Sequence, residues 1–240
     1  MITNAHSGTN VEEIAPGIYR INTPLDIPGG AFSFNQYLVE DAEPLLFHTG
    51  PRRLFPLVRE AVNHVLPAER LRWIAFSHFE ADECGSLNEW LAIAPAAQAL
   101  CSTTAVMVSV ADVADREPRG LSDGETFSTG RRTLRWFDTP HLPHGWETGY
   151  LADESTSTLF CGDLFTQPGR GETALTSSDI LGPSESFRQS MDYYAHSKNA
   201  GEHFAKLAAF QPRTLAVMHG SAWQGDGAAL LRELARAVEA

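Results

Sequence analysis

The sequence predicts a layered α/β domain. Strand-like and helix-like runs alternate along the chain, and histidines or acids follow several of the strand-like runs. The chain has 240 residues, of which 43% are hydrophobic and 20% are charged, so it can bury a core of ordinary size. No repeat or linker divides it, and we therefore expect a single domain over residues 1–240.

The first half of the chain is expected to form strands followed by helices. Within the first 50 residues, short apolar runs broken by glycine and proline predict three strands, over 17–23, 32–41 and 44–50. Apolar residues at helical spacing predict a helix over 52–66, which ends before Pro67. The segments that follow are a buried strand (71–78), a helix (85–94), a strand (97–103) and a run that fits either type (103–114).

The second half adds strands that again end in polar residues. A strand is expected over 131–140, and a hairpin over 148–165 with its turn at the sequence "DEST". Serine, glycine and threonine are frequent over 170–188, which predicts a loop there. The last three elements are expected to be a helix (190–210), a strand that ends in His219 (213–220) and an amphipathic helix (227–240).

Charge and composition exclude several classes of partner. The formal net charge of −12 would repel nucleic acid and anionic membranes. No run approaches the roughly 18 apolar residues that a membrane-spanning helix needs, and the first ten residues lack the basic and apolar regions of a secretory signal. Cys84, Cys101 and Cys161 are too widely spaced for a disulfide framework and suit a reducing compartment, so we expect a cytoplasmic protein.

The stretch "SHFEADECG" places four ionisable side chains directly after a predicted buried strand. They are His78, Glu80, Asp82 and Glu83. Three further candidates follow other strand-like runs. They are His144, Asp163 and His219. Because residues at strand ends can converge on one edge of a sheet, we expect these side chains to lie together.

Such a cluster points to bound metal. Crowded carboxylates repel one another and raise each other's pKa unless a cation compensates their charge. Imidazole and carboxylate ligands suit iron, manganese or zinc, and a shared carboxylate such as Asp163 can bridge two ions about 3.5 Å apart. The sequence therefore predicts a metal site without thiolate ligands.

These motifs resemble those of the metallo-β-lactamase fold superfamily. Its HxHxDH segment and its distant His, Asp and His ligands are matched in order by "SHFEADECGSL", "TPHLPHGWETGYL", "LFCGDLF" and "VMHGSAW". The resemblance covers residues 12–225 and implies an αββα four-layer sandwich. Glu80 in place of the middle histidine, together with "HGSAW", is similar to the diiron domain of flavodiiron proteins, which reduce dioxygen or nitric oxide, and to related oxygen-binding diiron proteins.

The resemblance implies two neighbouring metal positions. The residues matched to the first are His78, Glu80, His144 and Asp163. Those matched to the second are Asp82, the bridging Asp163 and His219. His141, three residues before His144, is an alternative ligand or a contact behind one.

Two positions depart from the family pattern. Glu83 stands where the second motif histidine is usual, so either Glu83 or a water takes that ligand place. In the segment "HTG", His48 stands where an aspartate is usual, which leaves open what supports the ligands from behind.

The resemblance implies a non-haem diiron protein that binds or reduces dioxygen or nitric oxide. Two iron ions would form the cofactor, a separate flavoprotein or rubredoxin would supply electrons, and a homodimer is expected. The alternative is a hydrolase of a thioester, lactone or phosphoester, in which zinc or manganese activates water and Asp82 steers the nucleophile. A third interpretation is an oxygen sensor without turnover.

Overall fold

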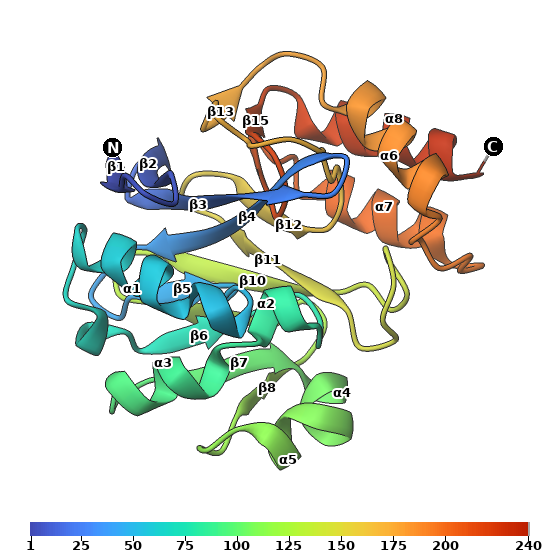
Figure 1. The fold of residues 1–240 in the computed structure, drawn as a ribbon. Coiled ribbons are helices and arrows are strands. Elements are labelled where there is room, and N and C mark those ends of the chain that lie inside the picture. The colour runs from blue at the N-terminus through green and yellow to red at the C-terminus, as the bar shows by residue number, and fades with distance from the viewer. Residues whose placement is uncertain (240) are drawn as a thin grey trace.

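Two β-sheets packed face to face form the centre of the molecule, and helices cover the outer face of each (Figure 1). The computed structural model describes residues 1–239. Within them, the first sheet has eight strands in chain order, antiparallel up to β5 and parallel from β5 to β8. Its strands are β1 (Ile2–Asn4), β2 (Thr9–Ala15), β3 (Ile18–Ile27), β4 (Gly30–Val39), β5 (Leu45–Phe47), β6 (Trp73–Ala75), β7 (Gln98–Ser102) and β8 (Arg119–Leu121).

The second sheet has seven strands in the order β13-β15-β14-β12-β11-β10-β9 within the described residues. Its strands are β9 (Thr126–Ser128), β10 (Thr133–Asp138), β11 (Gly149–Asp153), β12 (Thr158–Gly162), β13 (Leu175–Thr176), β14 (Thr214–Val217) and β15 (Ala222–Gln224). Strands β12 and β14 run parallel, so their carboxyl ends meet at the same edge of the sheet. This shared edge brings residues far apart in the chain together.

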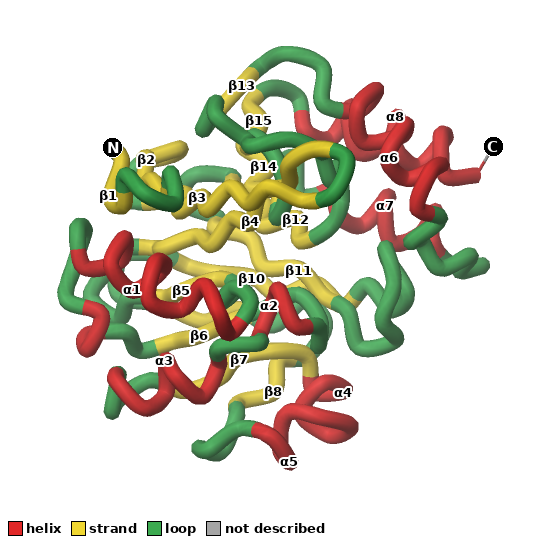
Figure 2. The backbone as a smooth tube through the Cα atoms, viewed as in Figure 1, coloured by secondary structure: helices red, strands yellow, loops and turns green. Residues whose placement is uncertain are grey.

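The helices are mostly short and connect or cover the strands (Figure 2). They are α1 (Phe55–Asn63), α2 (Ala81–Cys84), α3 (Leu87–Ile93), α4 (Thr103–Ala105), α5 (Ala111–Val113), α6 (Leu181–Met191), α7 (Ala200–Ala209) and α8 (Gly227–Glu239). Two 3-10 turns, η1 (Arg52–Leu54) and η2 (Ala68–Arg70), flank α1, and a π-helical turn, η3 (Val106–Val110), joins α4 to α5. None of the helices in residues 1–239 is long and apolar enough to cross a membrane.

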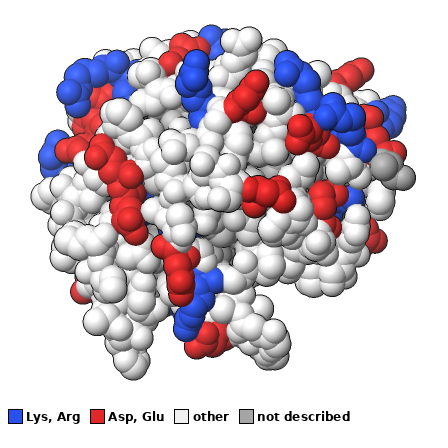
Figure 3. Space-filling view, turned by 90° about the horizontal axis from the view of Figure 1, so that it is seen from above, with Lys and Arg blue, Asp and Glu red and all other residues white. Residues whose placement is uncertain are grey.

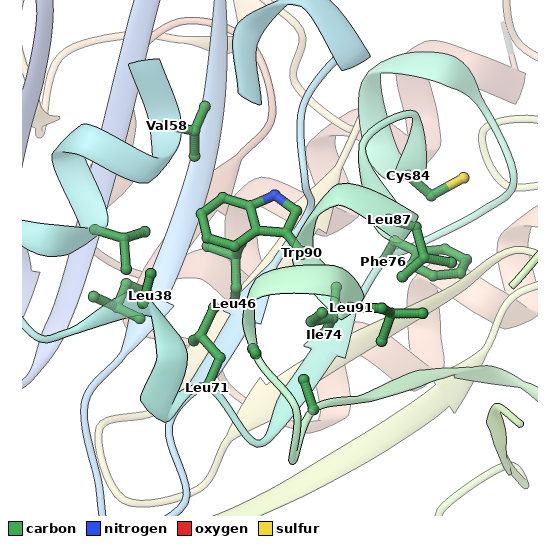
Figure 4. Packing of buried hydrophobic residues seen from close by; sticks show 14 of the residues in the cluster. Leu38, Leu46, Val58, Leu71, Ile74, Phe76, Cys84, Leu87, Trp90 and Leu91 are labelled. Atoms are coloured by element: carbon green, nitrogen blue, oxygen red, sulfur yellow. The ribbon is translucent and has the colours of Figure 1, made fainter. Parts of the chain in front are cut away.

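Three separate hydrophobic cores correspond to the three boundaries between four layers. Trp90 of α3 packs with residues of the first sheet, including Leu46 and Ile74, in the outer core shown in Figure 4. Between the sheets, the rings of Phe47 and Phe160 lie 5.0 Å apart. Burying each such large side chain stabilises the fold by about 1.5–3 kcal/mol.

The third core lies where α7 and α8 cover the second sheet, and includes Phe204, Leu215 and Leu231. The predicted αββα four-layer sandwich is therefore confirmed.

On the face shown in Figure 3, acidic and basic side chains lie interspersed and do not form separate acidic and basic patches.

The predictions for two segments were wrong. The loop expected over 170–188 ends early, because α6 begins at Leu181, where the side chain of Asp179 accepts hydrogen bonds from the backbone N–H groups of Leu181 and Gly182. The helix expected over 190–210 is interrupted between α6 and α7. Asp192 ends α6 in the left-handed conformation with φ of 49°, which turns the following residue out of the helical path.

The run left open over 103–114 is helical, as α4, η3 and α5. The hairpin over 148–165 is confirmed as the antiparallel pair β11 and β12. Five strands, β1, β2, β8, β9 and β15, received no specific prediction, and β13 lies within the loop expected over 170–188.

Candidate metal centre

The candidate ligands lie where strands end and loops begin. His78 follows β6 in the first sheet, whereas Asp163 and His219 follow β12 and β14 in the second. His144 lies in the loop between β10 and β11, and the acids of "EADE" lie at the start of α2. The candidate ligands thus lie together, as expected, and they follow strands of both sheets.

Four side chains form a first group. The Nε2 atoms of His78 and His144 lie 3.0 Å apart, and Glu80 Oε2 lies 3.1 Å from the former and 3.0 Å from the latter. Asp163 Oδ2 lies 3.6 Å from His78 Nε2 and 3.5 Å from His144 Nε2. One ligand atom from each side chain therefore faces a common point.

A second group lies beside the first. Asp82, Glu83 and His219 each offer one atom within 4.8 Å of the others. His219 Nε2 lies 3.4 Å from Asp82 Oδ2 and 3.3 Å from Asp163 Oδ1. Asp163 therefore directs one oxygen toward each group, as a carboxylate shared by two cations would do.

The outer ring nitrogens of His144 and His219 each contact a backbone carbonyl. Nδ1 of His144 donates to the carbonyl of Tyr193 at 3.0 Å, and Nδ1 of His219 donates to the carbonyl of Ser33 at 2.8 Å. Because a carbonyl can only accept, each Nδ1 carries a proton, and Nε2 is the nitrogen that faces the group and can bind a cation in place of a second proton. Metal-ligating histidines are oriented in this way.

The interior of the site contains polar atoms that the protein itself leaves unpaired. Both carboxylate oxygens of Glu83 and Oδ1 of Asp163 are buried without a hydrogen-bond partner among residues 1–239. Burial of an unpaired carboxylate is costly, and the Nε2 atoms of His78 and His144, 3.0 Å apart, repel one another unless a proton or a cation lies between them. Two cations would remove both penalties, so the donor set fits a dinuclear metal centre with imidazole and carboxylate ligands.

Charges in the cluster shift the pKa values of its side chains in opposite directions. Hydrogen bonds from His144 and His78 lower the pKa of Glu80 to about 2. Burial opposes the charge of His219, but Asp163 and Asp82 outweigh it and raise the pKa of His219 to about 9. Burial and the negative charges of Asp163 and Asp82 raise the pKa of Glu83 well above its usual range. Bound protons thus compensate part of the negative charge that metal cations would otherwise compensate.

Residues of the first sheet hold the segment that carries His219. Asn35 Nδ2 donates to the carbonyls of Val217 and Gly220 at 2.9 and 2.8 Å. The hydroxyl of Tyr37 donates to Val217 at 2.7 Å, and the buried guanidinium of Arg20 donates to Gly220 at 2.7 Å. These bonds join the two sheets directly behind His219, and sequence patterns did not indicate them.

Aromatic side chains surround the second group. The ring of Phe32 lies 4.4 Å from that of His219, and Phe187 stacks on Phe32 at 5.7 Å. Tyr193 lies 5.9 Å from Phe187, and its hydroxyl donates to the carbonyl of Asp163 at 3.2 Å. The turn at the end of α6 is therefore what brings Tyr193 against the site.

An open cavity of about 580 Å³ adjoins the first group through Glu80, and Phe79, Cys84, Leu87 and Asn88 lie among its lining residues. His141 is exposed and belongs to neither group, whereas His144 belongs to the first. Burial raises the pKa of the Cys84 thiol to about 12, which leaves it protonated at neutral pH.

Known proteins resemble this chain in sequence and in fold. A family model described as ODP family beta lactamase matches residues 32–220. Rubredoxin-oxygen oxidoreductase from Megalodesulfovibrio gigas is 23% identical over 188 residues, which cover 76% of this chain and 43% of that protein. The chain therefore spans less than half the length of this curated relative.

Solved structures share the fold. A mutant of the flavo di-iron protein from Thermotoga maritima superposes with a TM-score of 0.82 at 20% identity, over 95% of this chain and 62% of that one. A fragment of diflavin flavoprotein A 5 from Nostoc superposes with a TM-score of 0.77 at 18% identity, over 96% of this chain and 95% of the fragment. The two-sheet arrangement is thus one that such proteins also adopt.

Proposed function

Because the chain belongs to the ODP family of beta lactamases, we propose that it is a non-haem diiron protein that binds or reduces dioxygen or nitric oxide. The observation that carries the proposal is the placement of Asp163 between two ligand groups, with one oxygen toward each. A relative of this chain is named as a rubredoxin-oxygen oxidoreductase, which agrees with oxygen as the ligand.

In this proposal the two groups divide the ligands. His78, Glu80 and His144 would hold the first iron, and Asp163 would be shared. Asp82, Glu83 and His219 would complete the second position. Glu83 would take the ligand place that the family gives to a histidine, because its oxygens are buried, unpaired and adjacent to Asp82 and His219.

The surrounding residues would control which molecules reach the site and would keep a proton near it. Two ferrous ions, when bound, supply electrons to a small diatomic ligand. Phe32 and Phe187 would exclude water from the second group, and apolar walls favour an uncharged gas over ionic solutes. Burial raises the pKa of Tyr193, so this phenol keeps its proton close to the site. The hydroxyl of Tyr193 uses this proton to donate a hydrogen bond to the carbonyl of Asp163.

Hydrolysis is the less favoured function. The relatives that match this chain are named as oxidoreductases or flavoproteins, and the carboxylate of Glu80 adds a hard ligand that suits iron. A zinc or manganese hydrolase, with Asp82 steering the attacking water, is the alternative. An oxygen sensor without turnover would use the same diiron site.

Electrons for reduction must come from a donor. We propose a separate flavoprotein or rubredoxin, since the curated relative is named for rubredoxin. We also propose that the chain forms a homodimer, which size-exclusion chromatography with light scattering would detect.

Metal content tests the proposed function. Protein purified without added metal, or reconstituted anaerobically with ferrous iron, is expected to contain two irons per chain by plasma emission spectroscopy. Stoichiometric zinc with no iron bound after reconstitution would overturn the diiron assignment. Oxygen consumption by the reduced protein with a rubredoxin donor would then separate a reductase from a sensor, which should take up oxygen reversibly.

A further inference from the structure

A continuous line of hydrogen bonds lies behind the candidate ligand His78. The Nδ1 atom of His78 lies 3.0 Å from Ser77 Oγ, and Ser77 Oγ lies 3.1 Å from Nε2 of His48. On the far side, Nδ1 of His48 lies 3.0 Å from the sulfur of Met218. All four residues are buried, at 2% exposure or less. The line thus runs from His78 into the space between the sheets.

A backbone group determines the direction of these bonds. The N–H of Ser77 donates to Nε2 of His48 at 3.4 Å, and a backbone N–H can only donate. Nε2 of His48 is therefore an acceptor, and the proton of a neutral His48 lies on Nδ1, directed at Met218. The hydroxyl of Ser77, which is closer at 3.1 Å, then shares the lone pair of His48 Nε2 as a second donor and accepts from Nδ1–H of His78.

The backbone around His48 holds its ring in place. Its φ is 65°, a left-handed conformation that is uncommon for a residue other than glycine. The N–H of His48 donates to the carbonyl of Ala75 at 2.7 Å, and the next N–H, of Thr49, donates to the carbonyl of Glu83 at 2.7 Å. The same short segment therefore contacts both the strand before His78 and the helix that carries Glu83.

We propose that His48 and Ser77 are positioning residues that hold His78 in its Nδ1–H tautomer through an uncharged relay, in place of the carboxylate that commonly supports a metal-bound histidine. The inference rests on the proposed function in one respect, namely that Nε2 of His78 binds metal. A neutral acceptor polarises the imidazole less than a carboxylate does. His78 is therefore a weaker donor here, and the first metal position should bind a divalent ion less tightly than a carboxylate-supported one.

The tautomers can be observed directly in the wild-type chain. Zinc replaces iron as a diamagnetic probe, and histidine side chains labelled with nitrogen-15 are followed by long-range proton–nitrogen correlation. We expect His48 to be neutral, with its proton on Nδ1, and His78 to carry a proton on Nδ1 while Nε2 binds zinc. A proton on Nε2 of His48 would overturn the relay, because Ser77 would then have to accept from both rings.

Cobalt(II) affinity tests the strength of the relay. His48→Asp should tighten binding of the first ion about tenfold, the lower end of the effect known for groups behind metal ligands. His48→Gln, which keeps an acceptor for the serine, should bind within about threefold of wild type, whereas His48→Leu and Ser77→Ala should each bind about tenfold more weakly. Thermal melting of each variant checks that the fold is retained.

A double-mutant cycle separates the relay from simple charge attraction. If His48 acts through the serine, the gain from His48→Asp disappears in a Ser77→Ala background. A gain that persists there would show that only the added charge matters, and would overturn the relay. Failure of the wild-type chain to bind zinc or cobalt at all would instead refute the proposed function, so the two failures are distinguishable.

Discussion

Replacement of Asp163 by alanine is expected to remove both metal ions from the protein. Asp163 directs one oxygen toward each ligand group, with its Oδ2 near His78 and its Oδ1 near His219. Loss of a group behind a ligand already costs 10–100-fold in metal affinity, so loss of a shared ligand should exceed about 100-fold at each position. Iron per chain, measured after anaerobic reconstitution and desalting, should fall from two to near zero.

Two matched variants serve as controls for this result. Asp112→Ala removes an exposed carboxylate from α5 and should retain both ions. Glu80→Ala removes a candidate ligand of the first group only and should lose one ion. Retention of two ions by Asp163→Ala, or by the double variant with His78→Ala, would show that the metals lie elsewhere. Circular dichroism of the variants should remain that of the folded chain.

Elements with strong local signals could be predicted from the sequence. The apolar run before His78 and the hairpin before Asp163 have patterns typical of buried strands, and both form strands in the structure. The resemblance to the metallo-β-lactamase fold superfamily, on which the four-layer arrangement depended, is confirmed by the family match. The start of α6 was missed because its signal is a single side chain, Asp179, in a stretch rich in serine and glycine.

The candidate ligands could be predicted from the sequence, but the groups that hydrogen-bond to them and orient them could not. Histidine and carboxylate residues at strand ends are visible in a sequence, and the structure brings the seven predicted residues into two adjoining groups. The groups that orient His144 and His219 are the backbone carbonyls of Tyr193 and Ser33, and a carbonyl has no residue-type signal. The contact of His48 with Ser77 depends on a left-handed backbone conformation, which side-chain patterns do not reveal.

Glu83→Gln is expected to change the stability of the protein in opposite directions with and without metal. The side chain of Glu83 is fully buried and its pKa lies above the ordinary value of 4.5, because burial and the charges of Asp163 and Asp82 oppose its ionisation. Folding of the metal-free chain at neutral pH therefore requires either a bound proton or a buried unpaired charge. The amide needs neither, so Glu83→Gln should stabilise the metal-free protein by about 1–3 kcal/mol at pH 7.

The pH dependence of that gain follows from the raised pKa. For an acid whose pKa is higher in the folded state, the stabilisation from its proton is complete below the unfolded value near 4.5 and is lost as the pH rises toward the folded value. The advantage of Glu83→Gln should therefore be absent near pH 4 and grow between pH 4.5 and neutrality. Urea denaturation in a chelator, at several pH values, measures this.

With metal bound, the sign should reverse. An amide oxygen is a weaker ligand than a carboxylate, so Glu83→Gln should bind the second ion at least about tenfold more weakly and melt below the metal-loaded wild type. Glu202→Gln, which removes the same charge from an exposed position on α7, should leave both stabilities within about 0.5 kcal/mol of wild type. If Glu83→Gln destabilised the chain equally with and without metal, Glu83 would be a structural residue, and water would take the ligand place.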